Sequence, residues 1–181
     1  MGNKAVFIDR DGTINVNVEY LDNPDRFQMY VGVAEGIKLL KDNGFKIIVI
    51  TNQSGIARGY FPEKTLEKIH EKMEKELLKK GAALDAIYYC PHHPDDNCDC
   101  RKPNTGLFKK AVKDFDVDTS RSFVIGDMMA DIEAGHRMGL KTILVPEKKD
   151  LVEKEMKESK IKPDLVCDDF YTGAIWIIDR I

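Results

Sequence analysis

The feature that most constrains the fold is a regular alternation of short, β-branched apolar runs with amphipathic segments of helical length. The runs that read as strands cover residues 4–8, 46–51, 84–89, 122–125, 141–145 and 164–167. The segments that read as helices cover residues 33–43, 63–80, 106–114, 130–138, 149–160 and 171–181. Strands that alternate with helices pair in parallel through right-handed crossovers. We therefore predict an α/β fold with a doubly wound, Rossmann-like parallel sheet in three layers.

Apolar residues at helical spacing predict which helix faces pack on this sheet. They form three stripes: Ala34, Ile37 and Leu40; Leu66, Ile69, Met73 and Leu77; and Ile175, Trp176 and Ile178. The run 47–50 is apolar on both faces, as in central strands of parallel sheets. The second strand should therefore lie inside the sheet.

Length and charge limit the classes of protein to consider. The 181 residues suit one domain spanning 1–181, and the net charge of −3 gives no basic excess for nucleic acid. No stretch approaches the ~20 apolar residues of a membrane helix, and no signal-peptide pattern opens the chain. We expect a cytoplasmic protein with a small-molecule partner and, from its charged helix faces, a monomer. Three clustered cysteines fit a metal site in a reducing compartment, whereas Cys167 is expected in the core.

Two carboxylates follow the first strand directly. Asp9 and Asp11 are one residue apart, and Gly12 supplies the turn that ends the strand. In open α/β sheets the carboxyl ends of strands form the ligand-binding edge. Two carboxylates this close require a cation between them or a proton on one. By itself the pattern also fits a solvated turn.

Polar residues also follow the later strands. Thr51 and Asn52 end the second strand, the third leads to Arg101 and Lys102, and Asp127 ends the fourth, with Asp131 close behind. A carboxylate nucleophile, a hydroxyl, a lysine and Mg²⁺ ligands are the parts that phosphoryl transfer requires. Asp9 and Asp127 are the natural magnesium ligands. The alternatives are helix capping for Asp127 and Asp131, and local backbone bonding for Thr51.

In this order the motifs Asp9-Arg10-Asp11-Gly12-Thr13, Thr51-Asn52, Lys102 and Gly126-Asp127 with Asp131 resemble those of the haloacid dehalogenase superfamily of aspartyl phosphatases. The resemblance implies that Asp9 is the nucleophile and that Asp11 first protonates the leaving group and then activates water. It also implies that Mg²⁺ is held by the Asp9 carboxylate, the Asp11 backbone carbonyl and Asp127. Thr51 and Lys102 would hold the transferring phosphoryl group, and Asp131 would orient Lys102 or a metal-bound water.

A second constellation lies in the loop 90–103. Cys90, His92, Cys98 and Cys100 supply three thiolates and an imidazole, a complete tetrahedral set for structural Zn²⁺. His93 is the alternative imidazole, and a disulfide is the alternative fate of the thiols. Because the loop runs into Arg101 and Lys102, we expect the metal to set the position of Lys102.

Within the superfamily, this loop resembles a zinc-loop subgroup that includes phosphatases of a heptose bisphosphate and of histidinol phosphate. The segment 51–60 and the start of the zinc loop look more like the heptose branch. Arg58 and Arg101 would then grip the second, non-reacting phosphate, because guanidinium forks suit phosphate oxygens. An ordinary exposed arginine is the alternative for Arg58.

Arg10, Asn52 and Gln53 are the remaining expected contacts to a sugar phosphate substrate. Met128 departs from the heptose branch, where a polar or basic residue is expected. No long insertion follows the first or second strand, so no separate cap domain is expected. A zinc-stabilised domain that binds phosphate without turnover is the non-enzyme alternative, but it would not need both Asp9 and Asp11.

Overall fold

The computed structural model describes residues 2–180, which form a six-stranded sheet with the order β3-β2-β1-β4-β5-β6. Every neighbouring pair of strands is parallel. The strands are β1 (Ala5–Ile8), β2 (Lys46–Asn52), β3 (Ala86–Cys90), β4 (Phe123–Gly126), β5 (Lys141–Leu144) and β6 (Leu165–Val166). This is the doubly wound order, and it confirms the predicted fold class.

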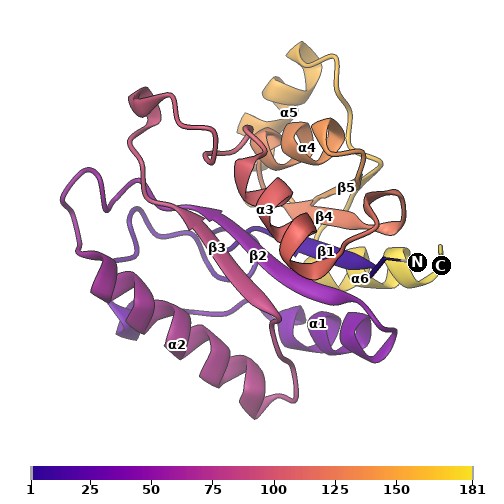
Figure 1. Ribbon diagram of the computed structural model, residues 1–181, viewed down its shortest axis with the longest axis horizontal. Coiled ribbons are helices and arrows are strands. Elements are labelled where there is room, and N and C mark those ends of the chain that lie inside the picture. Colours follow the sequence, from indigo (N-terminus) through magenta and orange to yellow (C-terminus); the bar gives the residue numbers. More distant parts are fainter. Residues whose placement is uncertain (1, 181) are drawn as a thin grey trace.

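Helices cover both faces of the sheet, which makes three layers (Figure 1). They are α1 (Val33–Asp42), α2 (Glu63–Lys79), α3 (Gly106–Phe115), α4 (Met129–Arg137), α5 (Lys149–Glu158) and α6 (Phe170–Ile178). Helices α1, α2 and α6 share one hydrophobic core, whereas α3 and α4 share the core on the other face. No helix in residues 2–180 is both long and apolar enough to cross a membrane.

Strand β1 shows how the sequence builds the two cores. Val6 and Ile8 are fully buried on the side of α1, and Ala5 and Phe7 are fully buried on the side of α3. This alternation follows from the two-residue repeat of a strand. Because both faces are covered, β1 is apolar throughout and sits between β2 and β4 at the centre of the sheet.

The predicted inner faces of α1 and α2 are confirmed, but that of α6 is partly wrong. Trp176 and Ile178 pack against the core, whereas Ile175 is 41% exposed. Phe170, Ala174 and Ile177 face inward instead. The closing segment is apolar nearly all round, so its periodicity does not select a face.

The connections that follow β1 and β2 are loops. Within the described residues, 9–32 contains one 3₁₀ turn, Pro24–Arg26, and isolated bridges, and 53–62 contains no helix or strand. The expectation of a fold without a separate cap domain is therefore confirmed. These loops leave the carboxyl ends of β1, β2 and β4 open to ligands.

Candidate active site

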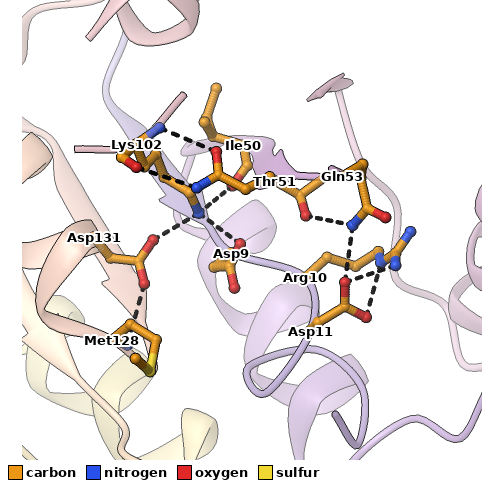
Figure 2. A network of polar contacts seen from close by, with 10 residues as sticks. Asp9, Arg10, Asp11, Ile50, Thr51, Gln53, Lys102, Met128 and Asp131 are labelled. Carbon is orange, nitrogen blue, oxygen red and sulfur yellow. Dashed lines mark hydrogen bonds and ion pairs between the residues drawn. The ribbon is translucent and has the colours of Figure 1, made fainter. Parts of the chain in front are cut away.

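Lys102 is the centre of the polar network at the carboxyl ends of the strands (Figure 2). Its Nζ lies 2.5 Å from Asp9 Oδ1 and 2.6 Å from Asp131 Oδ1, and it donates to the Ile50 carbonyl at 2.7 Å. Burial alone would lower the pKa of Lys102, but Asp131 and Asp9 outweigh it and raise that pKa. Lys102 therefore stays charged although it is nearly inaccessible to water.

Two neighbours fix the position of this lysine. The Asn52 side chain donates to the Lys102 carbonyl at 3.2 Å and accepts from the Lys102 N–H at 3.0 Å. Asp131 receives Lys102 on one oxygen and accepts from the Met128 N–H at 3.2 Å on the other. Asp131 thus contacts both the first turn of α4 and Lys102, so capping and pairing with the lysine occur in the same side chain.

Three carboxylates gather beside Lys102. Ligand oxygens of Asp9, Asp127 and Asp131 all lie within 4.8 Å of one another. Burial raises the pKa of Asp9 to about 6, against the lowering effect of Lys102. Burial, and then the charges of Asp9 and Asp131, raises the pKa of Asp127 to about 9. One lysine does not neutralise this cluster.

Asp127 has an unmet need for a positive partner. Its Oδ1 is buried and has no hydrogen-bond partner among the described residues. A Cβ on Gly12 would lie 2.3 Å from Asp127 Oδ2, and Gly12 has a φ of +87°, so only glycine suits this turn. A divalent cation held by oxygen ligands fits the cluster.

Asp11 is held apart from these acids. Its carboxylate accepts from Arg10, from Asn15 at 3.0 Å and from Gln53 at 2.8 Å. Burial alone would raise the pKa of Asp11, but the Arg10 charge and these hydrogen bonds outweigh it and keep that pKa below its ordinary value. The side chain is outside the cluster that could hold a metal ion, which leaves it available for proton transfer.

Arg10 lies behind Asp11 rather than at the pocket surface. Its side chain is fully buried, its Nη2 lies 2.7 Å from Asp11, and its Nη1 lies 3.2 Å from His70 Nε2. Burial, and then the Arg10 charge, lowers the pKa of His70 to about 3, so the ring is neutral and accepts from Arg10. The structure therefore places Arg10 in support of Asp11 and away from the expected substrate contact.

The loops at the carboxyl ends of the strands surround a pocket with a volume of about 690 Å³. The predicted site residues that line it are Asp9, Asp11, Thr51, Asn52, Gln53, Arg101, Lys102, Asp127 and Asp131. Gln53 donates to Thr51 Oγ1 at 2.9 Å, so one amide connects Thr51 with Asp11. Arg58 is exposed and does not line the pocket.

The cysteine-rich loop forms a second cluster. Cys90 Sγ lies 3.6 Å from Cys98 Sγ and 3.1 Å from Cys100 Sγ, and His92 Nδ1 lies 3.1 Å from Cys100 Sγ. All four ligand atoms lie within 4.8 Å of one another, so the group could hold a metal ion. His93 lies outside this group, and its Nδ1 accepts from the Asp95 N–H at 3.3 Å. The four cysteines are free thiols.

Comparison with known proteins identifies the family. Residues 99–172 match a family model described as HAD-hydrolase-like. D-glycero-beta-D-manno-heptose-1,7-bisphosphate 7-phosphatase of Haemophilus ducreyi is 43% identical over 176 residues, which are 93% of this chain and 94% of that protein. The chain belongs to the haloacid dehalogenase superfamily of phosphatases.

Other proteins that are similar to this chain are also named as heptose bisphosphate phosphatases. A probable D-glycero-D-manno-heptose-1,7-bisphosphate 7-phosphatase of Thermoplasma volcanium is 47% identical over 68% of this chain and 85% of that protein. The crystal structure of D,D-heptose 1,7-bisphosphate phosphatase from B. bronchiseptica, complexed with magnesium and phosphate, is 32% identical with a TM-score of 0.89. It aligns over 98% of this chain and 99% of that chain.

The candidate site also contains two residues that were not predicted from the sequence. His70 supports Arg10, and Asn15 holds Asp11. His70 lies four residues after Leu66 and three before Met73, so it is a polar residue on the apolar stripe of α2. That interruption is a usable signal, whereas nothing in its neighbourhood marks Asn15.

Proposed function

We propose that this phosphatase removes the 7-phosphate of D-glycero-D-manno-heptose 1,7-bisphosphate. The observation that carries the proposal is the 43% identity to a phosphatase named for that reaction over nearly the whole of both chains. The pocket supports it, because a volume of about 690 Å³ accommodates a sugar with two phosphates.

In the first step, an Asp9 carboxylate oxygen attacks the phosphorus of the 7-phosphate. A bond forms between Asp9 and phosphorus while the bond from phosphorus to the sugar oxygen breaks. Asp11 gives its proton to that oxygen, and the sugar leaves as an alcohol. Lys102, 2.5 Å from Asp9, and Thr51 stabilise the charge on the transferring group.

In the second step, water attacks the phosphorus of the aspartyl phosphate and Asp11 takes up the proton. This restores Asp9 and releases inorganic phosphate. The lowered pKa of free Asp11 keeps its carboxyl ionised, which is the form that can take up a proton. An incoming phosphate dianion raises that pKa, which favours the protonated form that the first step needs.

Mg²⁺ is the proposed cofactor, held by the carboxylates of Asp9 and Asp127 and by the Asp11 carbonyl. The unpartnered buried oxygen of Asp127 and its raised pKa support this choice. When bound, Mg²⁺ neutralises phosphoryl oxygens and thereby lowers the repulsion that Asp9 meets.

We also propose Zn²⁺ for the group Cys90, His92, Cys98 and Cys100. Tetrahedral Zn²⁺ with Zn–S bonds of about 2.3 Å has sulfur–sulfur edges of about 3.8 Å. The spacings of 3.1–3.6 Å among the three thiols lie slightly below that value. All four positions would be occupied, so the role would be structural.

We further propose that the phosphatase works as a monomer in the cytoplasm. One chain supplies every group named in the reaction, and free thiols persist in a reducing compartment.

The test is kcat/KM with Mg²⁺ for both anomers of heptose 1,7-bisphosphate and for histidinol phosphate, measured side by side. We expect kcat/KM for one bisphosphate anomer to exceed that for histidinol phosphate about a hundredfold or more. This ratio is roughly 2.7 kcal/mol of differential transition-state binding. A preference for histidinol phosphate would overturn the substrate assignment. Similar slow rates on all three would leave phosphatase chemistry with another substrate.

A further inference from the structure

Three basic side chains line the pocket, namely those of Arg101, Lys102 and Lys148. Lys102 is paired with Asp9 and Asp131. Within residues 2–180, neither Arg101 nor Lys148 forms an ion pair, and Nη1 of Arg101 is buried without a hydrogen bond. The pocket therefore keeps two positive charges available for an anion other than the reacting phosphate.

Lys148 reaches the pocket from a connection that is tied to the opposite loop. It lies between β5 and α5, directly after Glu147. Glu147 accepts from the Asn17 N–H at 2.9 Å and from the Tyr30 hydroxyl. Asn17 lines the pocket, so these contacts hold the residue before Lys148 against the pocket's own wall.

The other residues at this rim do not supply a cation. Met128, which follows Asp127, lines the pocket with an apolar side chain, and Glu19 lines it with a negative one. A phosphate bound away from Asp9 is a dianion and needs positive or N–H partners. Arg101 and Lys148 are the basic residues placed to provide them.

We propose that Lys148 is a specificity-determining residue that binds, together with Arg101, the non-reacting phosphate of a sugar bisphosphate. The proposal rests on the proposed function, because a monophosphate ester has nothing to offer this residue. Lys148 is exposed, so it meets the phosphate at the rim, whereas Arg101 is half-buried and meets it deeper in the pocket.

The test compares Lys148→Met with Lys149→Met. Lys149 is the matched control, because it is adjacent, is paired with Asp168 at 2.7 Å and does not line the pocket. KM and kcat are measured for heptose 1,7-bisphosphate and for the same sugar with only its 7-phosphate. We expect K148M to raise KM for the bisphosphate about tenfold with kcat unchanged, as for the loss of one charge-assisted contact.

The same measurements separate the possible failures. K148M should leave the monophosphate reaction unchanged, and K149M should match the wild type on both substrates. If the wild type prefers the bisphosphate and K148M keeps that preference, only the assignment of Lys148 is overturned. Equal losses on both substrates would also overturn it. A wild type without preference for the bisphosphate would overturn the proposed function and this inference together.

Discussion

At the scale of single residues, the candidate site depends on buried ion pairs centred on Lys102 and Arg10. Lys102 is shared by Asp9 and Asp131, and Arg10 by Asp11 and His70. Breaking such a pair leaves an uncompensated charge, which is strongly destabilising. Substitutions that keep shape and hydrogen bonding are therefore the informative ones.

Asp9→Asn should abolish turnover and preserve the fold. The amide cannot act as the nucleophile, yet it can still accept from Lys102, and it removes one of the mutually repelling carboxylates. We expect kcat to fall by about 10³-fold or more with Tm unchanged or slightly raised. Hydrolysis at a wild-type rate by this variant would contradict the aspartyl-phosphate mechanism.

His70→Gln should reduce the sensitivity of the fold to acid. The pKa of His70 is lowered to about 3 in the folded protein, so the unfolded chain binds the extra proton as the pH falls below about 6.5. As the pH falls from 7.5 to 5, protonation of His70 in the unfolded chain therefore lowers the free energy of unfolding by about 2 kcal/mol. Glutamine offers Arg10 an acceptor that does not titrate in this range.

Urea unfolding of both proteins at pH 7.5 and pH 5 measures this difference. The wild type should lose about 2 kcal/mol more than the variant over that interval. Equal losses would mean that His70 is protonated in the folded protein and does not accept from Arg10.

At the scale of elements, the periodicity of strands and helices predicts which faces are buried, whereas the loop sequences do not predict where side chains point. The strand β2 and the stripes of α1 and α2 follow from two- and 3.6-residue repeats, and they occur as predicted. The direction of a side chain after a strand end follows no such repeat. Arg10 therefore turned inward unpredicted, and Asn52 bonds the backbone of Lys102, which is distant in sequence.

Metal removal from the cysteine cluster should act on catalysis through the loop 90–103. Only one residue, Arg101, separates Cys100 from Lys102, so loosening the cluster should displace the lysine. We expect Cys98→Ser, or chelation followed by restoration of Mg²⁺, to lower kcat about tenfold or more and to speed hydrogen exchange across the loop.

Cys167→Ser is the matched control for this prediction. Its thiol lies outside the cluster, where it packs against the core beneath α6, so its loss should spare kcat and loop exchange. Full activity with Mg²⁺ in protein shown to be metal-free at the cysteines would mean that Lys102 does not depend on the cluster.

At the scale of the whole molecule, the acidic pocket makes stability depend on pH and on the cation together. Burial raises the pKa of Asp9 to about 6 and that of Asp127 to about 9, so without metal the folded protein binds protons that the unfolded chain has lost. As the pH rises from about 4 through the pKa values of Asp9 and Asp127, the folded protein gives up these protons. The free energy of unfolding therefore falls over this range. A bound cation takes the place of the protons.

Mg²⁺ should therefore raise Tm more at high pH than at low pH. At pH 8 we expect a rise of about 5–10 °C at saturating Mg²⁺, and at pH 5.5 a smaller one, because protons compete for Asp9 and Asp127. Thermal unfolding with and without Mg²⁺ measures both values. Asp127→Asn should remove most of the gain, and a gain independent of pH would place the cation elsewhere.

The strand order has a consequence for a chain that is still being synthesised. Strand β1 pairs with both β2 and β4, and Asp9 meets Lys102 across 93 residues of sequence. A ribosome-bound chain that has emerged only as far as β3 carries Asp9 and Asp11 but neither the lysine nor Asp127. The proposed chemistry can therefore begin only after β4 has joined the sheet.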